Sequence, residues 1–189
     1  MSPAPAAQSS LNPGGGPSAQ LIQIRDLVYR VAGMFQPDSK LRVLENRCWK
    51  RMQVLGVTTL RDYYRCLTVK PTHQPELVAL LNEITVGETC FFRNLPQLDA
   101  LRSIVLPRMV DAKVKMSARH LRIWSAGCST GEEPYTLSMI LREEISGPLQ
   151  GWTFEILATD LNEHSVVHAE QGLYGEYSIR NLPEYFRQK

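Results

Sequence analysis

The sequence predicts an α/β fold of the doubly wound kind, preceded by an all-helical domain. A short apolar run, Leu121–Trp124, leads into a turn of small residues, 126–131, and then into an apolar stripe at helical spacing that includes Leu137 and Ile140. A strand, a glycine turn and a helix in this order begin a doubly wound sheet, which binds ligands at the carboxyl ends of its strands. A second apolar run, 152–158, supplies another strand. Residues 21–84 show only helical spacing.

Length and composition limit the class of protein. The 189 residues leave room for one domain or two small ones. No apolar run approaches the ~20 residues of a membrane span, and the N-terminus lacks the pattern of a secretory signal. The cysteines form no C-x-x-C pair, so we expect neither a disulfide framework nor a zinc-thiolate site, and we expect a cytoplasmic location. They are Cys48, Cys66, Cys90 and Cys128.

Four segments are predicted along the chain. Residues 1–20 are mostly Pro, Ala, Ser, Gly and Gln without charge, and we expect a disordered tail. Residues 21–86 form a helical domain, in which Asp38 or Ser39 caps the second helix. Residues 87–118 form a hinge and a linker helix, from Pro96 to about Lys115, that Pro107 kinks. Residues 119–189 form a partial α/β domain.

Charge is distributed unevenly along the chain. Residues 21–70 hold ten Lys and Arg against four Asp and Glu, and residues 131–189 hold four against ten. The second predicted helix places Lys40, Arg47, Lys50 and Arg51 away from its apolar stripe, on one basic face. This face is open to three interpretations: solvated surface charge, non-specific nucleic-acid binding, or docking on an acidic protein surface. Aromatic residues do not alternate with the cations as a single-strand binder requires.

The turn after the first strand indicates the chemistry of its ligand. Its glycines, Gly127 and Gly131, do not have the G-x-G-x-x-G spacing of dinucleotide binders. Glu132 and Glu133 begin the next helix, where a pyrophosphate would meet like charges although the helix dipole favours it. S-adenosylmethionine carries a sulfonium and an ammonium and fits this loop better than NAD. A purely structural strand-turn-helix is the alternative, and a nicotinamide dehydrogenase is a more distant one.

Two further groups bear on the site. Asp160 ends the second strand, where an acid of this fold class accepts hydrogen bonds from both ribose hydroxyls. His164 and His168 lie one helical turn apart but have no further ligands nearby, so we expect no metal site. Upstream, Phe91 and Phe92 indicate a packed hinge between the helical half and the α/β half. The alternative is that both are core residues and Arg93 is a surface cation, since a functional Arg93 would have to point into the cofactor cleft.

Three motifs of the sequence resemble motifs of one known family and occur in the same order as in that family. They are Thr89-Cys-Phe-Phe-Arg93, Arg122-Ile-Trp-Ser-Ala-Gly-Cys-Ser-Thr-Gly-Glu-Glu-Pro-Tyr135, and Ala158-Thr-Asp160 followed by Ala169-Glu-Gln-Gly-Leu-Tyr174. They are similar to those of the CheR family, chemotaxis-receptor protein-glutamate O-methyltransferases that use S-adenosylmethionine. The resemblance runs from about Leu21 to the end of the chain. It implies a helical domain, a linker helix and a class I, Rossmann-like methyltransferase sheet.

The resemblance also implies roles for individual residues. Thr89, Arg93, Glu133 and Asp160 would contact the cofactor, with Gly127 in the backbone turn, and Arg93 would lie near the methyl-transfer centre as the catalytic residue. The basic face of Lys40, Arg47, Lys50 and Arg51 would dock on the cytoplasmic helical region of receptors. Gly87 departs from the family, which has asparagine there, so one cofactor contact is expected to be lost. Family members also continue well beyond residue 189, so a partial sheet is expected.

Two functions follow as hypotheses. In the first, the chain belongs to an enzyme that transfers methyl from S-adenosylmethionine to receptor glutamates, releasing S-adenosylhomocysteine. In the second, it is a non-catalytic module that docks on receptors or another acidic partner. We expect no nucleic-acid partner and no membrane insertion. A two-stranded partial sheet leaves an edge through which the chain could associate with itself.

Overall fold

The computed structural model describes residues 17–69, 73–145, 147 and 149–188. Contacts divide the chain into two compact units, Met1–Thr85 and Val86–Lys189, called unit 1 and unit 2 below. Most of the predicted tail, residues 1–16, lies outside the described residues. Ala19 and Gln20 already belong to the first helix, so ordered structure begins before Leu21.

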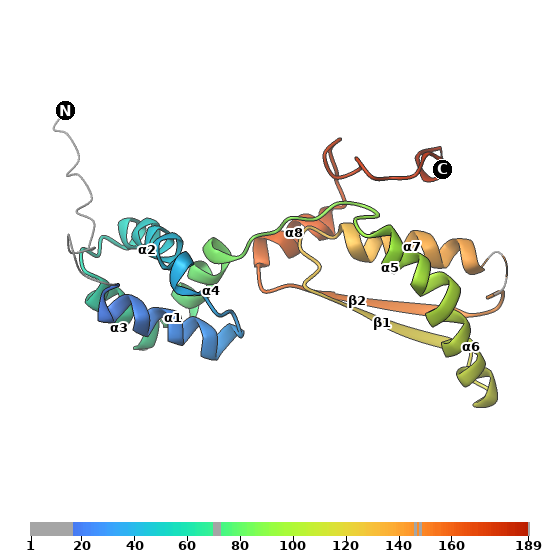
Figure 1. Cartoon of the computed structure of the whole chain (residues 1–189), viewed down its shortest axis with the longest axis horizontal. Helices are drawn as coiled ribbons and strands as arrows, with labels where there is room; N and C mark the ends of the chain where they lie inside the picture. Colours follow the sequence, from blue (N-terminus) through green and yellow to red (C-terminus); the bar gives the residue numbers. More distant parts are fainter. Residues whose placement is uncertain (1–16, 70–72, 146, 148, 189) are drawn as a thin grey trace. The chain divides into compact units, whose positions relative to one another are not determined.

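Unit 1 is helical. Its helices are α1 Ala19–Ala32, the 3₁₀ turn η1 Asp38–Lys40, α2 Leu41–Leu55, α3 Leu60–Thr68 and α4 His73–Ile84 (Figure 1). Ser18 and Thr59 cap α1 and α3 by accepting backbone N–H groups through their hydroxyls. The predicted cap of α2 is wrong: Asp38 and Ser39 lie inside η1, and the residue at the N-cap of α2 is Lys40, which makes no side-chain cap hydrogen bond. The turn supplies the backbone hydrogen bonds that a cap would otherwise provide.

One apolar core holds unit 1 together. The apolar stripe of α1 faces those of α2, α3 and α4, and burying these side chains supplies most of the stabilisation of such short helices. The most deeply buried members are Leu21, Ile24, Val28, Leu44, Cys48, Met52, Tyr63, Leu67 and Leu80.

Unit 2 contains the sheet. Its elements are α5 Leu95–Ala100, the π-helical segment η2 Leu101–Val105, α6 Leu106–Lys115, β1 His120–Ala126, α7 Glu132–Ile145, β2 Thr153–Thr159, α8 Glu163–Gln171 and α9 Glu184–Arg187. Strands β1 and β2 pair in parallel, from His120 opposite Thr153 to Ala126 opposite Thr159. Helix α7 is the crossover between them, and in Figure 1 it runs alongside both strands. The predicted strand-turn-helix unit is therefore present.

The linker helix is helical throughout but not uniform. Between α5 and α6 lies the π-helical segment η2, which ends two residues before Pro107. Proline has no N–H and its ring crowds the preceding turn, so a π-helical segment accommodates it within a helical run. Leu106 of α6 packs with Leu121 of β1 and Leu141 of α7 in the core beneath the sheet.

The two faces of the sheet differ in exposure. The side chains of Leu121, Ile123 and Ser125 turn toward the covered face, and successive strand residues alternate between faces. On the other face Trp124 is 68% exposed and Leu157 is 57% exposed. Doubly wound sheets are normally covered on both faces, and the described part of this sheet is covered on one.

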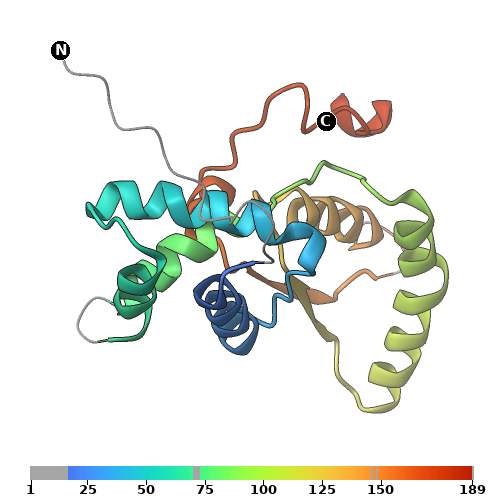
Figure 2. The same ribbon diagram turned by 60° about the vertical axis from the view of Figure 1, so that its left-hand side comes forward.

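The segment after α8 packs against α7. Figures 1 and 2 both draw it on the other side of α7 from the strands. Phe91 and Phe92 join it there in a second cluster with Ile140, and Phe92 stacks near Phe186 with ring centroids 5.0 Å apart. The alternative that the two phenylalanines are core residues is confirmed, with exposures of 3% and 5%, and their cluster lies within unit 2.

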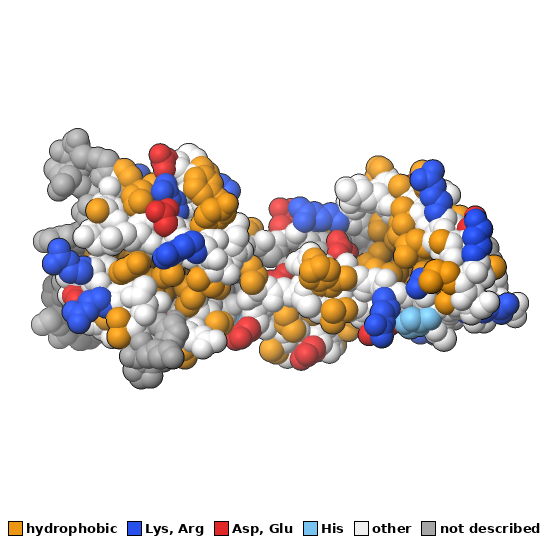
Figure 3. Space-filling model, turned by 90° about the horizontal axis from the view of Figure 1, so that it is seen from below, with side chains coloured by type: hydrophobic (Ala, Val, Ile, Leu, Met, Phe, Trp, Pro, Cys, Tyr) orange, Lys and Arg blue, Asp and Glu red, His pale blue; other side chains and the backbone are white. Residues whose placement is uncertain are grey.

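Hydrophobic side chains also reach the surface of both units, as the face drawn in Figure 3 shows. Within the described ranges, every helix is too short or too polar to cross a lipid bilayer.

Candidate functional site

The loop between β1 and α7 has the backbone conformation expected of a close-approach turn. Gly127, Ser129 and Gly131 all have positive φ angles, of 81°, 48° and 99°. The N–H groups of Gly127 and Cys128 donate to the carbonyl oxygen of Thr159 at 2.8 and 3.0 Å, so the loop is fastened to the end of β2. At Gly131 a Cβ atom would lie 2.7 Å from the Cβ of Ala169, so only glycine fits there.

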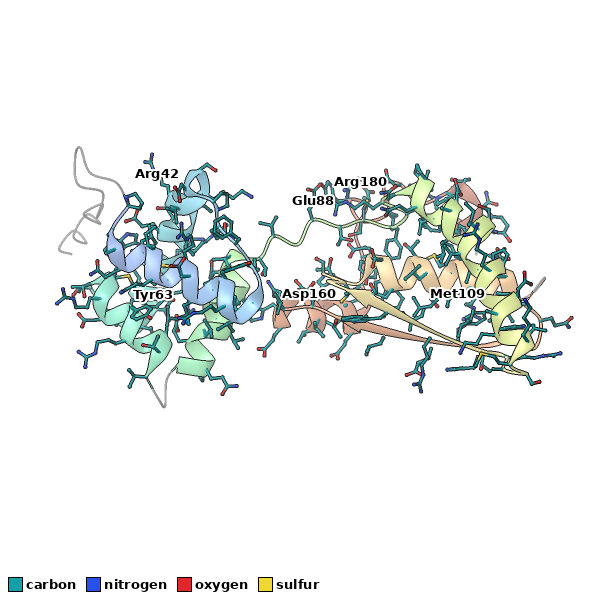
Figure 4. The ribbon with its side chains drawn as sticks, turned by 60° about the horizontal axis from the view of Figure 1, so that its bottom comes forward. Arg42, Tyr63, Glu88, Met109, Asp160 and Arg180 are labelled. Carbon is teal, nitrogen blue, oxygen red and sulfur yellow. The ribbon has the colours of Figure 1, made fainter. Side chains whose placement is uncertain are left out.

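Asp160 joins this loop to the start of α8. Its Oδ2 accepts the backbone N–H of Ser129 at 2.7 Å, and its Oδ1 accepts the N–H of Asn162 at 2.8 Å. The carboxylate is half-buried, and Figure 4 labels it beyond the carboxyl end of the strands. Hydrogen bonds to an ionised carboxylate are stronger than neutral ones, and each oxygen keeps a further lone pair. Asp160 can therefore fix the loop and still accept hydrogen bonds from a ligand.

The two glutamates at the start of α7 play different parts. Glu132 is 2% exposed, and its carboxylate accepts the hydroxyls of Thr130 at 2.6 Å and Ser178 at 2.8 Å. Glu133 is exposed, and its Oε1 accepts the Ser125 hydroxyl at 2.6 Å. Glu132 thus ties the loop to the C-terminal segment, whereas Glu133 is held by the strand end and faces outward. Of the two, Glu133 is the one available to a ligand.

The segment before α5 carries the other predicted cofactor residues. Thr89 is half-buried, and the Arg93 side chain is 57% exposed. The Arg93 guanidinium donates to the carbonyl oxygen of Glu88 and lies 3.9 Å from its carboxylate. Glu88 is labelled on this segment in Figure 4. Within the described part of unit 2, no hydrogen bond links Thr89 or Arg93 to Glu133 or Asp160. The structure brings the loop residues together and leaves Arg93 turned to its own segment.

Backbone bonds fix the position of this segment in unit 2. The N–H of Phe91 donates to the Ser178 carbonyl at 2.9 Å, and that of Phe92 to the Thr136 hydroxyl at 3.2 Å. Phe92 adopts a φ of 53°, an uncommon conformation for a bulky residue. Burial of both rings offsets this strain and fixes the backbone immediately before Arg93.

Cys128 lies at the bottom of the loop. Its thiol is 2% exposed, and burial followed by the charge of Asp160 raises its pKa. The neutral thiol acts there as a small packing group. Across the described residues, no three His, Cys, Asp or Glu side chains gather closely enough to hold a metal ion.

The basic face of unit 1 divides into two parts. Arg51 is 20% exposed and makes a two-bond pair with buried Glu76, at 3.0 and 2.8 Å, which also accepts the Tyr63 hydroxyl at 2.8 Å. Arg51 therefore has a structural contact inside the unit. Lys40 is exposed, and Arg47 and Lys50 lie 3.7 and 3.8 Å from the Glu83 carboxylate at the surface. These three cations are the accessible part of the face.

Sequence reasoning missed three groups. Ser125 holds Glu133, Ser178 contacts Glu132 from 46 residues away, and the Ser129 hydroxyl is buried without a hydrogen-bond partner among the described residues. The position of Ser125 near the end of the first strand gives a weak signal for its contact with Glu133. The contact of Ser178 and the burial of the Ser129 hydroxyl depend on residues distant in sequence.

The site's chemistry fits S-adenosylmethionine. Two carboxylates, Glu133 and Asp160, suit a ligand with cationic groups and ribose hydroxyls, and Ser129 offers a hydroxyl that is not yet used.

Comparison with known proteins supports the same assignment. Residues 19–85 match the family model "CheR methyltransferase, all-alpha domain", and residues 87–189 match "CheR methyltransferase, SAM binding domain". The chain is 33% identical to a chemotaxis protein methyltransferase of Borreliella burgdorferi over 90% of its length and 60% of the relative's. It is 34% identical to chemotaxis protein methyltransferase 2 of Vibrio cholerae, over 85% of its own length and 54% of the relative's. It is 30% identical to a chemotaxis protein methyltransferase of Escherichia coli, over 87% of its own length and 53% of the relative's. The chain thus spans a little over half the length of these relatives.

Proposed function

Since the chain belongs to the CheR methyltransferase family, we propose that it takes part in methyl transfer from S-adenosylmethionine to glutamate side chains of chemotaxis receptors. S-adenosylmethionine is the methyl donor of the family domain that residues 87–189 match. The observation that carries the proposal is the pair of carboxylates, Glu133 and Asp160, held at the carboxyl edge of the sheet by Ser125 and by two backbone N–H groups.

The loop residues would hold the cofactor. Asp160 would accept the ribose hydroxyls while keeping its bonds to Ser129 and Asn162, and Glu133 would face the cationic part of the ligand. Gly127 would let the backbone approach closely. When bound, S-adenosylmethionine supplies a methyl group attached to a positively charged sulfur.

The accepting glutamate needs no general base. Its ordinary pKa of about 4.3 leaves the carboxylate ionised and nucleophilic at neutral pH. The task left to the protein is to align an oxygen with the methyl group, which is worth several kcal/mol. Arg93 would orient that carboxylate through paired hydrogen bonds, exchanging its present contact with Glu88 for the substrate.

Unit 1 would supply the docking surface. Lys40, Arg47 and Lys50 carry positive charge at the surface and suit the acidic cytoplasmic helices of a receptor. Arg51 supports this face indirectly through Glu76, rather than by direct contact.

The sheet edge would support self-association. Both described strands have one unpaired edge, and unpaired N–H and C=O groups pair readily with a second strand. Light scattering at increasing protein concentration tests this, because a mass that stays at 21.4 kDa contradicts it.

Calorimetric titration of the chain with S-adenosylhomocysteine tests the proposed function. We expect micromolar binding, weakened in Glu133→Gln and unchanged in Glu155→Gln, whose carboxylate lies on exposed β2 and pairs with Arg122. A parallel titration with NAD is expected to give no heat. Absence of binding by the wild-type chain would favour a non-catalytic docking module instead.

A further inference from the structure

The hydroxyl of Ser129 is the unexplained polar group of the loop. The residue is 8% exposed, and its Oγ has no hydrogen-bond partner within the part of the chain that the structure describes. Its backbone is well fixed, because the N–H donates to Asp160 at 2.7 Å. A buried hydroxyl without a partner lowers stability, since it has lost water and gained nothing. Its presence at the centre of the loop between β1 and α7 therefore points to a use.

Gly87 lies next to this hydroxyl. A Cβ atom at position 87 would lie 2.7 Å from the Ser129 Oγ but 3.9 Å from the Ser129 Cβ. A Cβ atom at position 87 would therefore require the Ser129 hydroxyl to shift, while the Ser165 Oγ, at 3.8 Å, is at ordinary contact distance. The hydroxyl makes no hydrogen bond to Gly87, so the two residues meet only in van der Waals contact. Such a contact can open without the loss of a hydrogen bond.

The surroundings define the ligand groups that the hydroxyl can meet. Ser129 stands between Gly127 and Glu133 in the chain and is bonded to Asp160, so it lies among the groups that would hold the cofactor. A hydroxyl both donates and accepts, and so matches ribose hydroxyls, an ammonium or a carboxylate equally well.

We propose that the Ser129 hydroxyl is a further cofactor-binding group, which hydrogen-bonds S-adenosylmethionine when the segment around Gly87 moves off the loop. This assignment rests on the proposed function, since it requires that the loop bind the cofactor. The absence of a side chain at Gly87 is what allows the segment to lie this close to the hydroxyl.

A binding role and a structural role predict different effects of Ser129→Ala. Removing an unsatisfied hydroxyl is expected to raise the unfolding midpoint of the free protein. If the hydroxyl also contacts the cofactor, the same change raises the dissociation constant for S-adenosylhomocysteine, by roughly two- to tenfold for one hydrogen bond. If Ser129 had only a structural role, Ser129→Ala would change the unfolding midpoint and leave the dissociation constant for S-adenosylhomocysteine unchanged.

The experiment measures thermal unfolding and calorimetric titration with S-adenosylhomocysteine on the same variants. Ser103→Ala is the matched control, because Ser103 is exposed on η2 and its hydroxyl bonds only the Asp99 carbonyl of its own helix, at 2.7 Å. We expect this control to match the wild type in affinity. Ser129→Gly removes the same hydroxyl and tolerates the φ of 48°, so it keeps the test decisive if alanine is strained.

Two results separate failure of this assignment from failure of the proposed function. Wild-type binding with equal affinity in Ser129→Ala and Ser129→Gly overturns the assignment alone. No binding by the wild type overturns the proposed function and the assignment with it.

A double-mutant cycle tests the contact between Gly87 and the Ser129 hydroxyl. Gly87→Ala should lower the unfolding midpoint of the wild type and have a smaller effect in the Ser129→Ala background, where the nearest Ser129 atom is 3.9 Å away. An equal effect in both backgrounds would contradict the contact between Gly87 and the hydroxyl.

Discussion

Replacing Asp160 with Asn tests the loop most sharply, because the change removes a charge and one acceptor while keeping the shape. In the structure both carboxylate oxygens are used, one by the Ser129 N–H at 2.7 Å and one by the Asn162 N–H at 2.8 Å. The amide has one oxygen, so its NH₂ group must face one of these N–H donors. A hydrogen bond to a charged group contributes about 1.5–3 kcal/mol, and half-burial favours the lower end. We therefore expect Asp160→Asn to cost about 1.5–2 kcal/mol of unfolding free energy.

The assay is guanidinium unfolding followed by tryptophan fluorescence, which reports on unit 2 through Trp124 and buried Trp152 and on unit 1 through Trp49, so the unit 2 transition is read as the change relative to the wild type. Titration with S-adenosylhomocysteine accompanies it, and we expect clearly weaker binding because the ribose loses its acceptor. Glu155→Gln is the control: its exposed pair with Arg122 is worth at most about 1 kcal/mol. The proposed role of Asp160 in the loop is refuted if Asp160→Asn is no less stable than Glu155→Gln and binds S-adenosylhomocysteine equally well.

Three other predictions concern residues outside the loop. Arg93→Ala should change unfolding free energy by no more than about 0.5 kcal/mol, since its side chain is exposed, yet slow methyl transfer roughly tenfold or more; an equal loss of cofactor affinity would make it a binding residue. Arg47→Glu with Lys50→Glu should weaken association with a receptor's acidic helices, measured by co-sedimentation, with a smaller effect at high salt; unchanged association would exclude this face. Burial, followed by the charge of Glu45, raises the pKa of the Cys48 thiol from 9.0 to about 12. As pH rises above 9 the unfolded chain loses that proton before the folded chain does, so the free energy of unfolding should fall by up to roughly 1.4 kcal/mol per pH unit. The fall should be less steep in Cys48→Ala. Equal pH dependence of the unfolding free energy in the wild type and in Cys48→Ala would contradict this prediction.

The local features of the site could be predicted from sequence because they depend on short-range rules. The apolar run before Gly127, the small-residue turn and the helical spacing after Gly131 determine a strand, a close-approach loop and a helix without reference to the rest of the chain. The position of Asp160 follows from the next strand in the same way.

The different parts played by Glu132 and Glu133 could not be predicted. Two adjacent glutamates look alike in sequence, but successive helical residues point about 100° apart. One is buried against Ser178 and the other faces the strand end at Ser125.

The same limit applies to the basic face. Arg51 shares the helix surface of Arg47 and Lys50, yet Glu76 from another helix takes both its hydrogen bonds. Side-chain partners 25 residues away leave no trace in the spacing of charges along one helix.

The orientation of Arg93 also lies beyond a reading of the sequence. The buried Phe91 and Phe92 fix where the segment passes, and their burial could be predicted from their size and apolarity. The guanidinium that follows is exposed and contacts Glu88, and because it carries five donors that fit many acceptors, the sequence alone does not identify its partner.

The most direct test of the account is methyl transfer itself. The chain is incubated with S-adenosylmethionine carrying a tritiated methyl group and with membranes bearing chemotaxis receptors, and the receptor is then treated with mild base. Glutamate methyl esters hydrolyse under these conditions, so we predict receptor-bound label that is released as volatile methanol, in amounts reduced by Arg93→Ala. Label that stays on the receptor after base, or no label although S-adenosylhomocysteine binds, would contradict the account.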